Sequence, residues 1–472
     1  QACRCTEILS AAALLLLANC SPNDPTREAM PSSSALAPSE SVAPSQPPDF
    51  LLGGIQVNEA DPDRWFDALE AQSMNTVQIT DYAQQGDWDS DDLTWSEENA
   101  AAVAEMRGAQ ARGVSVVFIC RVHLDEAIAR NAFLWHGMIV PKTDELLAAW
   151  FEKYGRFVVR WAEIAEREGV DVFMIGSELN ALATTLPATE IPTLEEYFLN
   201  DVKQADRRAQ VLSQADSIDG RQPHEGFASV AEYIDARIAT ERAWAEIMTG
   251  GSIESVDALN ARRAQLKAYW RALIAKVRQV YSGQVGYAAN FDQYHEVGFW
   301  QDLDVMGINA YFPLRSHVLA DESEAKLAPL LVDGWRRVLS EVTEVRRRQQ
   351  LDQPVVFTEM GYTYRAKSTL NPWAHEGFAL IPAETTRADG SPGALQDSAV
   401  VWAEQPERRV ERAWAVRALW QAHGELAAPF LEGILYWKLS SHDYHLSEEA
   451  FMVHIGPGTD DPVLSELRRF LD

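Results

Sequence analysis

The sequence predicts an α/β fold, a (β/α)8 TIM barrel with a helical insertion after the fourth strand and a long loop after the seventh. Short apolar runs rich in β-branched and aromatic residues recur eight times from residue 51 onward. Segments with helical periodicity separate most of these runs, a pattern typical of parallel strands covered by helices. Eight such units in about 420 residues indicate a barrel. A doubly wound open sheet is the alternative, but "GGIQV" in the first run lacks the G-x-G-x-x-G phosphate pattern.

The first 49 residues differ in composition from the rest. Residues 1–20 contain an apolar stretch that begins at Ile8 and is too short to span a bilayer, so we interpret it as a secretory signal peptide. Its end, "LANC", resembles the lipobox of bacterial lipoproteins, which predicts lipidation of Cys20. Residues 21–49 are rich in Pro and Ser and predict a disordered linker. We therefore expect an exported lipoprotein at the outer membrane or cell surface, or in the periplasm.

We take residues 50–472 as one (β/α)8 domain. Its composition limits the kinds of molecule that it is expected to bind. The chain has 472 residues, 47% of them apolar, and a formal charge of −29. So acidic a surface repels phosphate backbones, which excludes nucleic acid as an expected partner, and it argues against a basic membrane-binding face. We expect a monomer that meets the membrane only through its N-terminal lipid anchor. Cys120 is the single cysteine of this domain, so an internal disulfide is excluded.

The predicted strands follow one another along the chain. They are 51–57 "LLGGIQV", 75–80 "NTVQIT", 114–122 "VSVVFICRV", 170–176 "VDVFMIG", 284–290 "QVGYAAN", 303–312 "LDVMGINAYF", 354–362 "PVVFTEMGY" and 432–440 "EGILYWKLS". Predicted helices between them include residues 61–72, 96–113 and 145–169.

Two connections are longer than a barrel needs. Residues from about 183 to 262 read as mostly helical, and residues from about 363 to 404 read as a loop with several prolines. Both follow the ends of strands. Long segments in a compact domain are usually functional loops or small inserted subdomains.

Polar residues stand where the predicted strands end, and in a barrel these ends form the active site. They are His123, Glu178, Asn290, Asn309, Tyr311, Glu359, Trp437 and Lys438. Glu178 and Glu359 are the two carboxylates of the set, and a buried carboxylate is costly unless it has partners. Either one alone fits a structural role. Together they indicate a catalytic pair, since two carboxyls about 5 Å apart serve a retaining glycosidase, and one ionised carboxylate raises the pKa of the other.

Other residues support a sugar site and give little support to alternatives. Tryptophans 135, 300, 373, 402 and 437 lie in or near the strand ends, where their rings can stack on pyranoses, although most tryptophans pack in cores. "HDYH" at 442–445 is a weak metal pattern, and we expect no metal site. A serine hydrolase is disfavoured because G-x-S-x-G does not occur.

Three stretches, "VFMIGSELN", "VVFTEMGY" and "ILYWKLS", resemble the fourth-, seventh- and eighth-strand motifs of clan A glycoside hydrolases. With "VFICRVHLDE" and "FWQDLDVMGINAYFPL", the chain is most similar to glycoside hydrolase family 113, which includes β-1,4-mannanases. The resemblance implies that Glu178 is the acid/base and Glu359 the nucleophile, without a cofactor. It further implies that the sugar subsites are lined by His123, Trp135, Asn290, Tyr311 and Trp437.

The chain departs from this pattern in two places. Ser177 stands where much of the clan has Asn before the acid/base, and the segment after Asn180 is longer than expected. The predicted function is a retaining glycoside hydrolase that cleaves a β-linked polysaccharide or oligosaccharide, with β-1,4-mannan as the leading substrate. The alternatives are another clan A activity, on β-glucan, β-galactan or small glycosides, and a non-catalytic glycan-binding lipoprotein.

Overall fold

The computed structural model describes residues 48–56, 59, 61–184, 256–373, 378–382, 398–402, 405–427, 429–447 and 449–471, with scattered positions between 202 and 244. The predicted signal peptide with Cys20, and the linker up to residue 47, lie outside the described residues. Within the described part, none of the helices combines the length and the apolar character needed to cross a bilayer.

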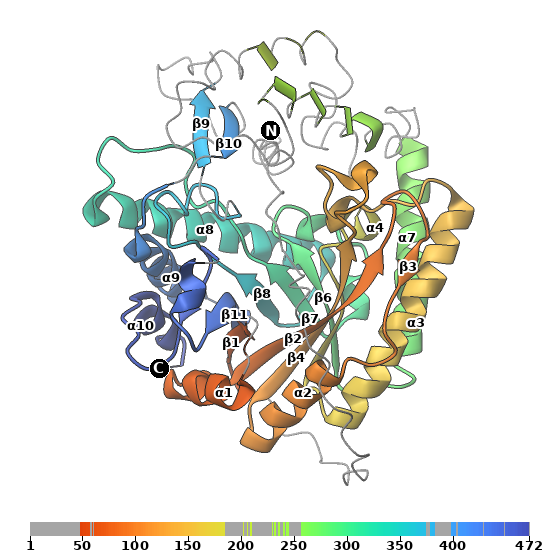
Figure 1. Cartoon of the computed structure of the whole chain (residues 1–472), viewed down its shortest axis with the longest axis horizontal. Helices are drawn as coiled ribbons and strands as arrows, with labels where there is room; N and C mark the ends of the chain where they lie inside the picture. Colours follow the sequence, from red (N-terminus) through yellow and green to blue (C-terminus); the bar gives the residue numbers. More distant parts are fainter. Residues whose placement is uncertain are drawn as a thin grey trace.

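Eight parallel strands close into a barrel (Figure 1). They are β1 (Leu51–Gln56), β2 (Thr76–Gln85), β4 (Ser115–Leu124), β5 (Val172–Ser177), β6 (Gln284–Asn290), β7 (Val305–Asn309), β8 (Val355–Met360) and β11 (Leu431–Ser440). Neighbours pair in this order, and β1 closes the ring by pairing with both β2 and β11. The predicted (β/α)8 barrel is confirmed. Two short strands extend it, since β3 (Leu93–Thr94) pairs with β2 and β12 (Val453–His454) pairs with β11.

Helices surround the strands, as Figure 1 shows. They are α1 (Pro62–Ala71), α2 (Ala100–Arg112), α3 (Asp144–Glu168), α7 (Val256–Val277), α8 (Glu324–Gln349), α9 (Arg409–Gly424) and α10 (Val463–Arg468). Their ends follow local sequence signals. In α3 the Thr143 hydroxyl accepts from the backbone N–H of Leu146, and Gly169 ends the helix with a φ of 70°, a left-handed conformation that glycine adopts without a Cβ penalty.

One connection lacks the helix of an ideal barrel. Between β6 and β7, residues 291–304 form two short 3-10 turns, η6 (Tyr294–Glu296) and η7 (Trp300–Asp302). Trp300 is fully buried there and donates its indole N–H to the carbonyl of Tyr294 at 2.9 Å. This tryptophan therefore packs in the core and does not face a sugar site.

The core has two layers, which alternate along each strand because successive side chains point to opposite faces. Inside the barrel lies a cluster of Leu51, Val117, Ile119, Val172, Met174, Ala288, Val305, Val356 and Leu435. The larger cluster, between the strands and the helices, takes the intervening residues, such as Val116, Phe118 and Cys120 of β4. The residue that follows Val117 and Ile119 on the inner face of β4 is Arg121.

The two long connections differ in how much of them is described. Between α4 (Asn180–Ala183) and α7, the described positions that carry secondary structure are helical, and the rest of the predicted insertion lies outside the described residues. α7 begins at Val256, within the predicted limits of the insertion. The prediction for residues 363–404 was wrong in one respect. β9 (Phe378–Pro382) and β10 (Ser398–Trp402) form an antiparallel pair, because two short apolar runs can pair across a proline-containing segment.

Candidate active site

Side chains of the inner strand face converge at the carboxyl end of the barrel. Each of four polar or aromatic residues continues the inner face of its strand. Arg121, Asn290 and Trp437 come two residues after the interior Ile119, Ala288 and Leu435, and Asn309 comes four residues after Val305. Glu359 stands in β8 opposite Asn309 of β7 in the strand register. Strand alternation brings the cation, the two amides and the indole to one opening. Glu359 reaches the same opening through a register shift, since a step of two residues in β7, from Gly307 to Asn309, pairs with a step of three in β8, from Val356 to Glu359.

Glu359 is 3% exposed and receives three donors. Arg121 forms a buried ion pair with it through Nη2. The amide Nδ2 of Asn309 donates to Oε1 at 3.0 Å, and the hydroxyl of Tyr311 donates to Oε2 at 2.6 Å. These three donors fix the orientation of the Glu359 carboxylate and fill the hydrogen-bond acceptor sites of its ionised form.

Opposing effects act on the pKa of the Glu359 carboxyl, which is raised above its usual value. Burial is the largest cause, and the negative charge of Glu178 adds to it, whereas the guanidinium of Arg121 and the hydroxyl of Tyr311 lower the pKa. Burial, followed by the charge of Glu359, raises the pKa of Tyr311 well above its usual value. Tyr311 therefore remains a hydrogen-bond donor to Glu359 across the physiological pH range.

Glu178 follows β5 directly and has a φ of 52°, in the left-handed region that a non-glycine residue enters at a cost of about 1–2 kcal/mol. The turn is held on both sides of the residue. The backbone N–H of Glu178 donates to the carbonyl of Ala288 at 2.8 Å, and that of Leu179 donates to the hydroxyl of Tyr287 at 2.9 Å. A Cβ at Gly176 would meet the Tyr154 hydroxyl at 3.0 Å, so the strand before the turn packs closely on α3.

The Glu178 side chain meets a histidine from another loop. Oε2 lies 3.1 Å from Nε2 of His136, which begins the 3-10 turn η3 (His136–Met138) between β4 and α3. Burial raises the pKa of Glu178, but the hydrogen bond and the charge of His136, together with Arg121, bring it below the usual value.

Asn309 and Arg121 connect the two carboxyls. Asn309 Nδ2, which bonds Glu359, also lies 3.2 Å from the hydroxyl of Ser177, next to Glu178. Arg121 lowers the pKa of both carboxyls, and the charge of Glu178 raises that of Glu359. Two groups coupled in this way release their protons as a pair.

The remaining predicted residues lie around these carboxyls. The ring of Trp437 lies 5.0 Å from the guanidinium carbon of Arg121, and the Trp437–Lys438 peptide bond is cis. The ring of Trp135 lies edge-on to that of His136, with centroids 4.9 Å apart. His123 Nδ1 lies 3.1 Å from Oε1 of Gln84.

Asn290 ends β6 opposite Asn309 and is 3% exposed. Its Oδ1 accepts from the backbone N–H of Phe291 at 2.8 Å, so this side chain shapes the loop that follows the strand. Trp373 stacks on Phe291 with centroids 5.3 Å apart and is 6% exposed, which is a packing position. The Trp402 side chain lies outside the described residues.

Three polar residues of the site escaped the sequence reasoning. Arg121 was hidden in an apolar run, although it is the one cation in that run. His136 sits in a loop without a local signal. Asp292 follows β6, and burial and the charge of Glu178 raise its pKa to about 7. Its Oδ1 is buried and accepts no hydrogen bond from the described residues.

Among the described residues, which exclude the side chain of His445, no group of three His, Cys, Asp or Glu is placed to hold a metal ion. Of the "HDYH" segment, His442 Nε2 lies 3.8 Å from Glu59, and its ring faces Tyr444.

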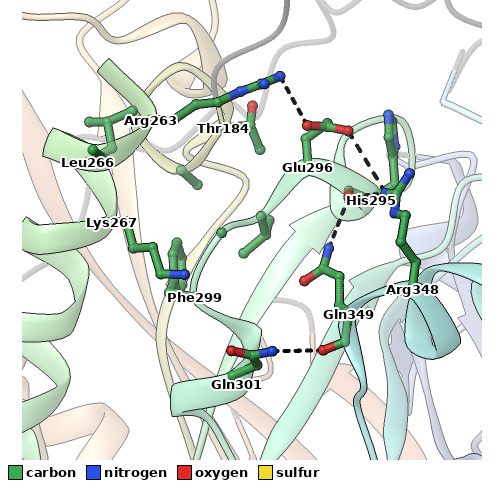
Figure 2. A pocket seen from close by; sticks show the side chains of 14 residues that line it. Thr184, Arg263, Leu266, Lys267, His295, Glu296, Phe299, Gln301, Arg348 and Gln349 are labelled. Carbon is green, nitrogen blue, oxygen red and sulfur yellow. Dashed lines mark hydrogen bonds and ion pairs between the residues drawn. The ribbon is translucent and has the colours of Figure 1, made fainter. Parts of the chain in front are cut away.

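A separate cavity of about 530 Å³ lies at the side of the barrel, where η6 and η7 replace a helix (Figure 2). Its lining includes Arg263, Lys267, Glu296, Phe299 and Arg348. Glu296 already pairs with Arg263 at 3.2 Å and approaches Arg348 at 3.9 Å. The two carboxyls at the barrel mouth are not among the residues that line it.

Comparisons with known proteins bear on the family and the fold of the chain. The model of Glycoside Hydrolase Family 113 matches residues 56–185 and 199–386, more than half of the chain. A solved GH113 β-mannanase from Alicyclobacillus acidocaldarius, in complex with ManMIm, is 18% identical over 89% of this chain and 96% of its own, with a TM-score of 0.54. A complex structure of a GH113 β-1,4-mannanase is 16% identical over 89% and 98%, with a TM-score of 0.50. These likenesses show the fold. The curated proteins include no match to the sequence.

Proposed function

Because the chain belongs to glycoside hydrolase family 113, we propose that this glycoside hydrolase is a retaining enzyme that cleaves β-1,4-mannan within the chain. One observation carries the proposal. Glu178 and Glu359 are two buried carboxyls at the ends of β5 and β8, joined through Asn309 and Arg121. The names of the similar solved structures, β-mannanases, support the choice of substrate.

In the first step, an oxygen of Glu359 attacks the anomeric carbon while the glycosidic C–O bond breaks. Glu178 donates its proton to the departing oxygen. Arg121, Asn309 and Tyr311 hold Glu359 in place for the attack. In the second step Glu178 takes a proton from water, the water oxygen bonds the anomeric carbon, and the bond to Glu359 breaks. The product keeps the β configuration.

This mechanism needs the proton of the carboxyl pair on Glu178 and the charge on Glu359. Three donors point at Glu359, among them a guanidinium, and all three stabilise its ionised form. Burial raises the pKa of Glu178, whereas His136 and Arg121 lower it. Burial, the largest of the effects on Glu178, is the one that favours its protonated form.

The sugar is held by the residues around the pair. Trp437 and Trp135 present rings for stacking on a pyranose, and His123, Asn290 and Tyr311 offer polar atoms for its hydroxyls. Ser177 has a shorter side chain than the Asn typical of the clan, and its hydroxyl is held by Asn309. We therefore infer that Ser177 helps to position the two carboxyls rather than to bind the sugar.

The first test is the product pattern on defined oligosaccharides. We expect mannotetraose and β-1,4-mannan to be cut to shorter mannosides, and NMR of the first product formed to show the β-anomer. Chromatography of products by chain length separates internal cleavage from release of single residues at one end.

Cleavage of β-glucan or β-galactan with mannotetraose left intact would reject the choice of mannan, but retain the glycoside hydrolase. An α-anomer formed first would instead reject the retaining mechanism. Each outcome thus bears on one part of the proposal.

We also propose that the enzyme is exported and anchored through a lipid on Cys20. The expected result is incorporation of labelled palmitate into the chain when it is produced in a bacterium, and recovery in the membrane fraction. A Cys20→Ala variant should lose the label and become free of the membrane. Equal labelling of the wild type and of Cys20→Ala would refute an anchor on Cys20.

A further inference from the structure

His136 links the candidate acid/base to a part of the chain far from it in sequence. Its Nε2 lies 3.1 Å from Oε2 of Glu178, and its side chain is 29% exposed at the edge of the site. The turn η3 that carries His136 packs against α4, the short helix that follows Glu178. The side chain of Glu178 therefore contacts η3 directly, and α4, which follows Glu178 in the chain, contacts η3 as well.

The η3 turn is fixed from the other side by a tryptophan of the segment between α4 and α7. The indole Nε1 of Trp244 donates to the carbonyl of Met138, the last residue of η3, at 2.9 Å. Trp244 is partly buried against the main core cluster, so its ring is itself held. One residue of the long connection therefore contacts the turn that places His136.

We propose that His136 is a positioning residue that shares the acid/base proton with Glu178, and that Trp244 holds His136 at this distance. The inference rests on the function proposed above. In the first chemical step the shared proton leaves from Oε2 of Glu178 to the glycosidic oxygen as the C–O bond breaks. No additional acid, base or electron donor is required.

Other titratable groups face this pair from each neighbouring element. His123 approaches His136 from β4. Burial lowers the pKa of His123, and the charge of His136 lowers it further. Arg121 acts on Glu178 from the same strand. Asp292 faces Glu178 from the end of β6, and Glu359 faces it from β8. Among these groups, His136 is the one that hydrogen-bonds the Glu178 carboxyl.

Sharing a proton determines what the pH profile reports. The charge of His136 lowers the pKa at which Glu178 loses the first proton of the pair. One proton then remains on the pair, and the acid form is the one with this proton on Glu178. The alkaline limb of kcat/KM therefore marks the loss of the last proton from both residues together.

His136→Gln leaves Glu178 to hold that proton alone. We expect the alkaline limb of kcat/KM to move to lower pH by about one unit, because a proton with two sites leaves at higher pH than a proton with one. Trp244→Phe keeps the ring but removes the donor to Met138. We expect kcat to fall by about tenfold, as for a slightly misplaced catalytic group, with a smaller limb shift in the same direction.

Matched controls remove the same groups elsewhere. Trp420→Phe loses an indole N–H that donates to the backbone carbonyl of Arg469 at 3.1 Å on the outer surface. His317→Gln changes a histidine that contacts Ser316 in an exposed turn. Both should keep the wild-type limb and kcat. If Trp244→Phe behaves like Trp420→Phe, Trp244 does not support the site.

A measurement without substrate separates this inference from the proposed activity. The protein for this measurement carries ¹³C-labelled glutamate carboxyls together with Glu359→Gln and Asp292→Asn, which remove the two other acids that face Glu178. The Glu178 signal, assigned by its loss in Glu178→Gln, should titrate in two steps. Adding His136→Gln, or His136→Asn should that variant fold better, should leave one step. One step with His136 present, together with an unmoved alkaline limb, would overturn the proposal even if mannan is hydrolysed.

Discussion

Glu359→Gln should abolish hydrolysis, with kcat lowered by about 10⁴-fold or more, the scale on which removal of a nucleophile falls. The free energy of unfolding of the variant should also fall by about 3–5 kcal/mol, because Arg121 is left as a buried charge opposite a neutral amide. Initial rates on a mannoside and thermal unfolding, measured on the same preparation, check both effects.

The control for lost charge is Glu168→Gln. Glu168 is a largely buried glutamate at the end of α3, away from the barrel mouth. It forms an ion pair with Arg107 of α2 at 2.8 Å. It should keep full activity. Azide added to Glu359→Ala should restore turnover, since the anion can attack the anomeric carbon where the carboxylate stood and yield an α-glycosyl azide. Full activity of Glu359→Gln would remove this residue from the mechanism.

Arg121→Met should lower kcat/KM by about 10²- to 10⁴-fold at neutral pH. The guanidinium lowers the pKa of Glu359 and of Glu178, so both values rise when it is removed. In the proposed mechanism Glu359 must be ionised for attack, and the acidic limb of the pH profile should therefore move to higher pH. Glu178 must be protonated, so the alkaline limb should move the same way. A profile of kcat/KM against pH checks the sign.

The stability of this variant distinguishes charge from packing. Loss of Arg121 alone leaves Glu359 buried and unpaired, whereas Arg121→Met with Glu359→Gln removes both charges. The double variant should be more stable than the sum of the two single losses predicts. Arg107→Met, which loses a half-exposed cation, should change stability little and the pH profile not at all. Additive losses would mean that the ion pair contributes nothing as a pair.

The strands were predictable because each is a continuous apolar run, and an all-parallel barrel buries both faces of its sheet. Glu178 and Glu359 stood out for the same reason, as charges that end such runs. The polar partners could not be found in this way. Arg121 meets Glu359 across 238 positions of sequence and His136 meets Glu178 across 42, and neither distance leaves a local pattern.

The missing helix and the β9–β10 pair show a second limit. Residues 291–304 are too few for a full crossover helix, and their two 3-10 turns are joined by Trp300 of η7, whose indole donates to the carbonyl of Tyr294 in η6. The apolar stretches of β9 and β10 are five residues each, short enough to read as loop between prolines. Pairing partners, rather than composition, decide such segments.

The left-handed backbone at Glu178 has a consequence for engineering. A glycine there would relax the backbone, and it would also remove a buried acid from a crowded site. Selection for heat resistance alone would therefore favour inactive descendants at this position. Laboratory evolution of this enzyme has to screen turnover in every round, and the residue at 178 is the first to sequence in survivors that no longer cut their substrate.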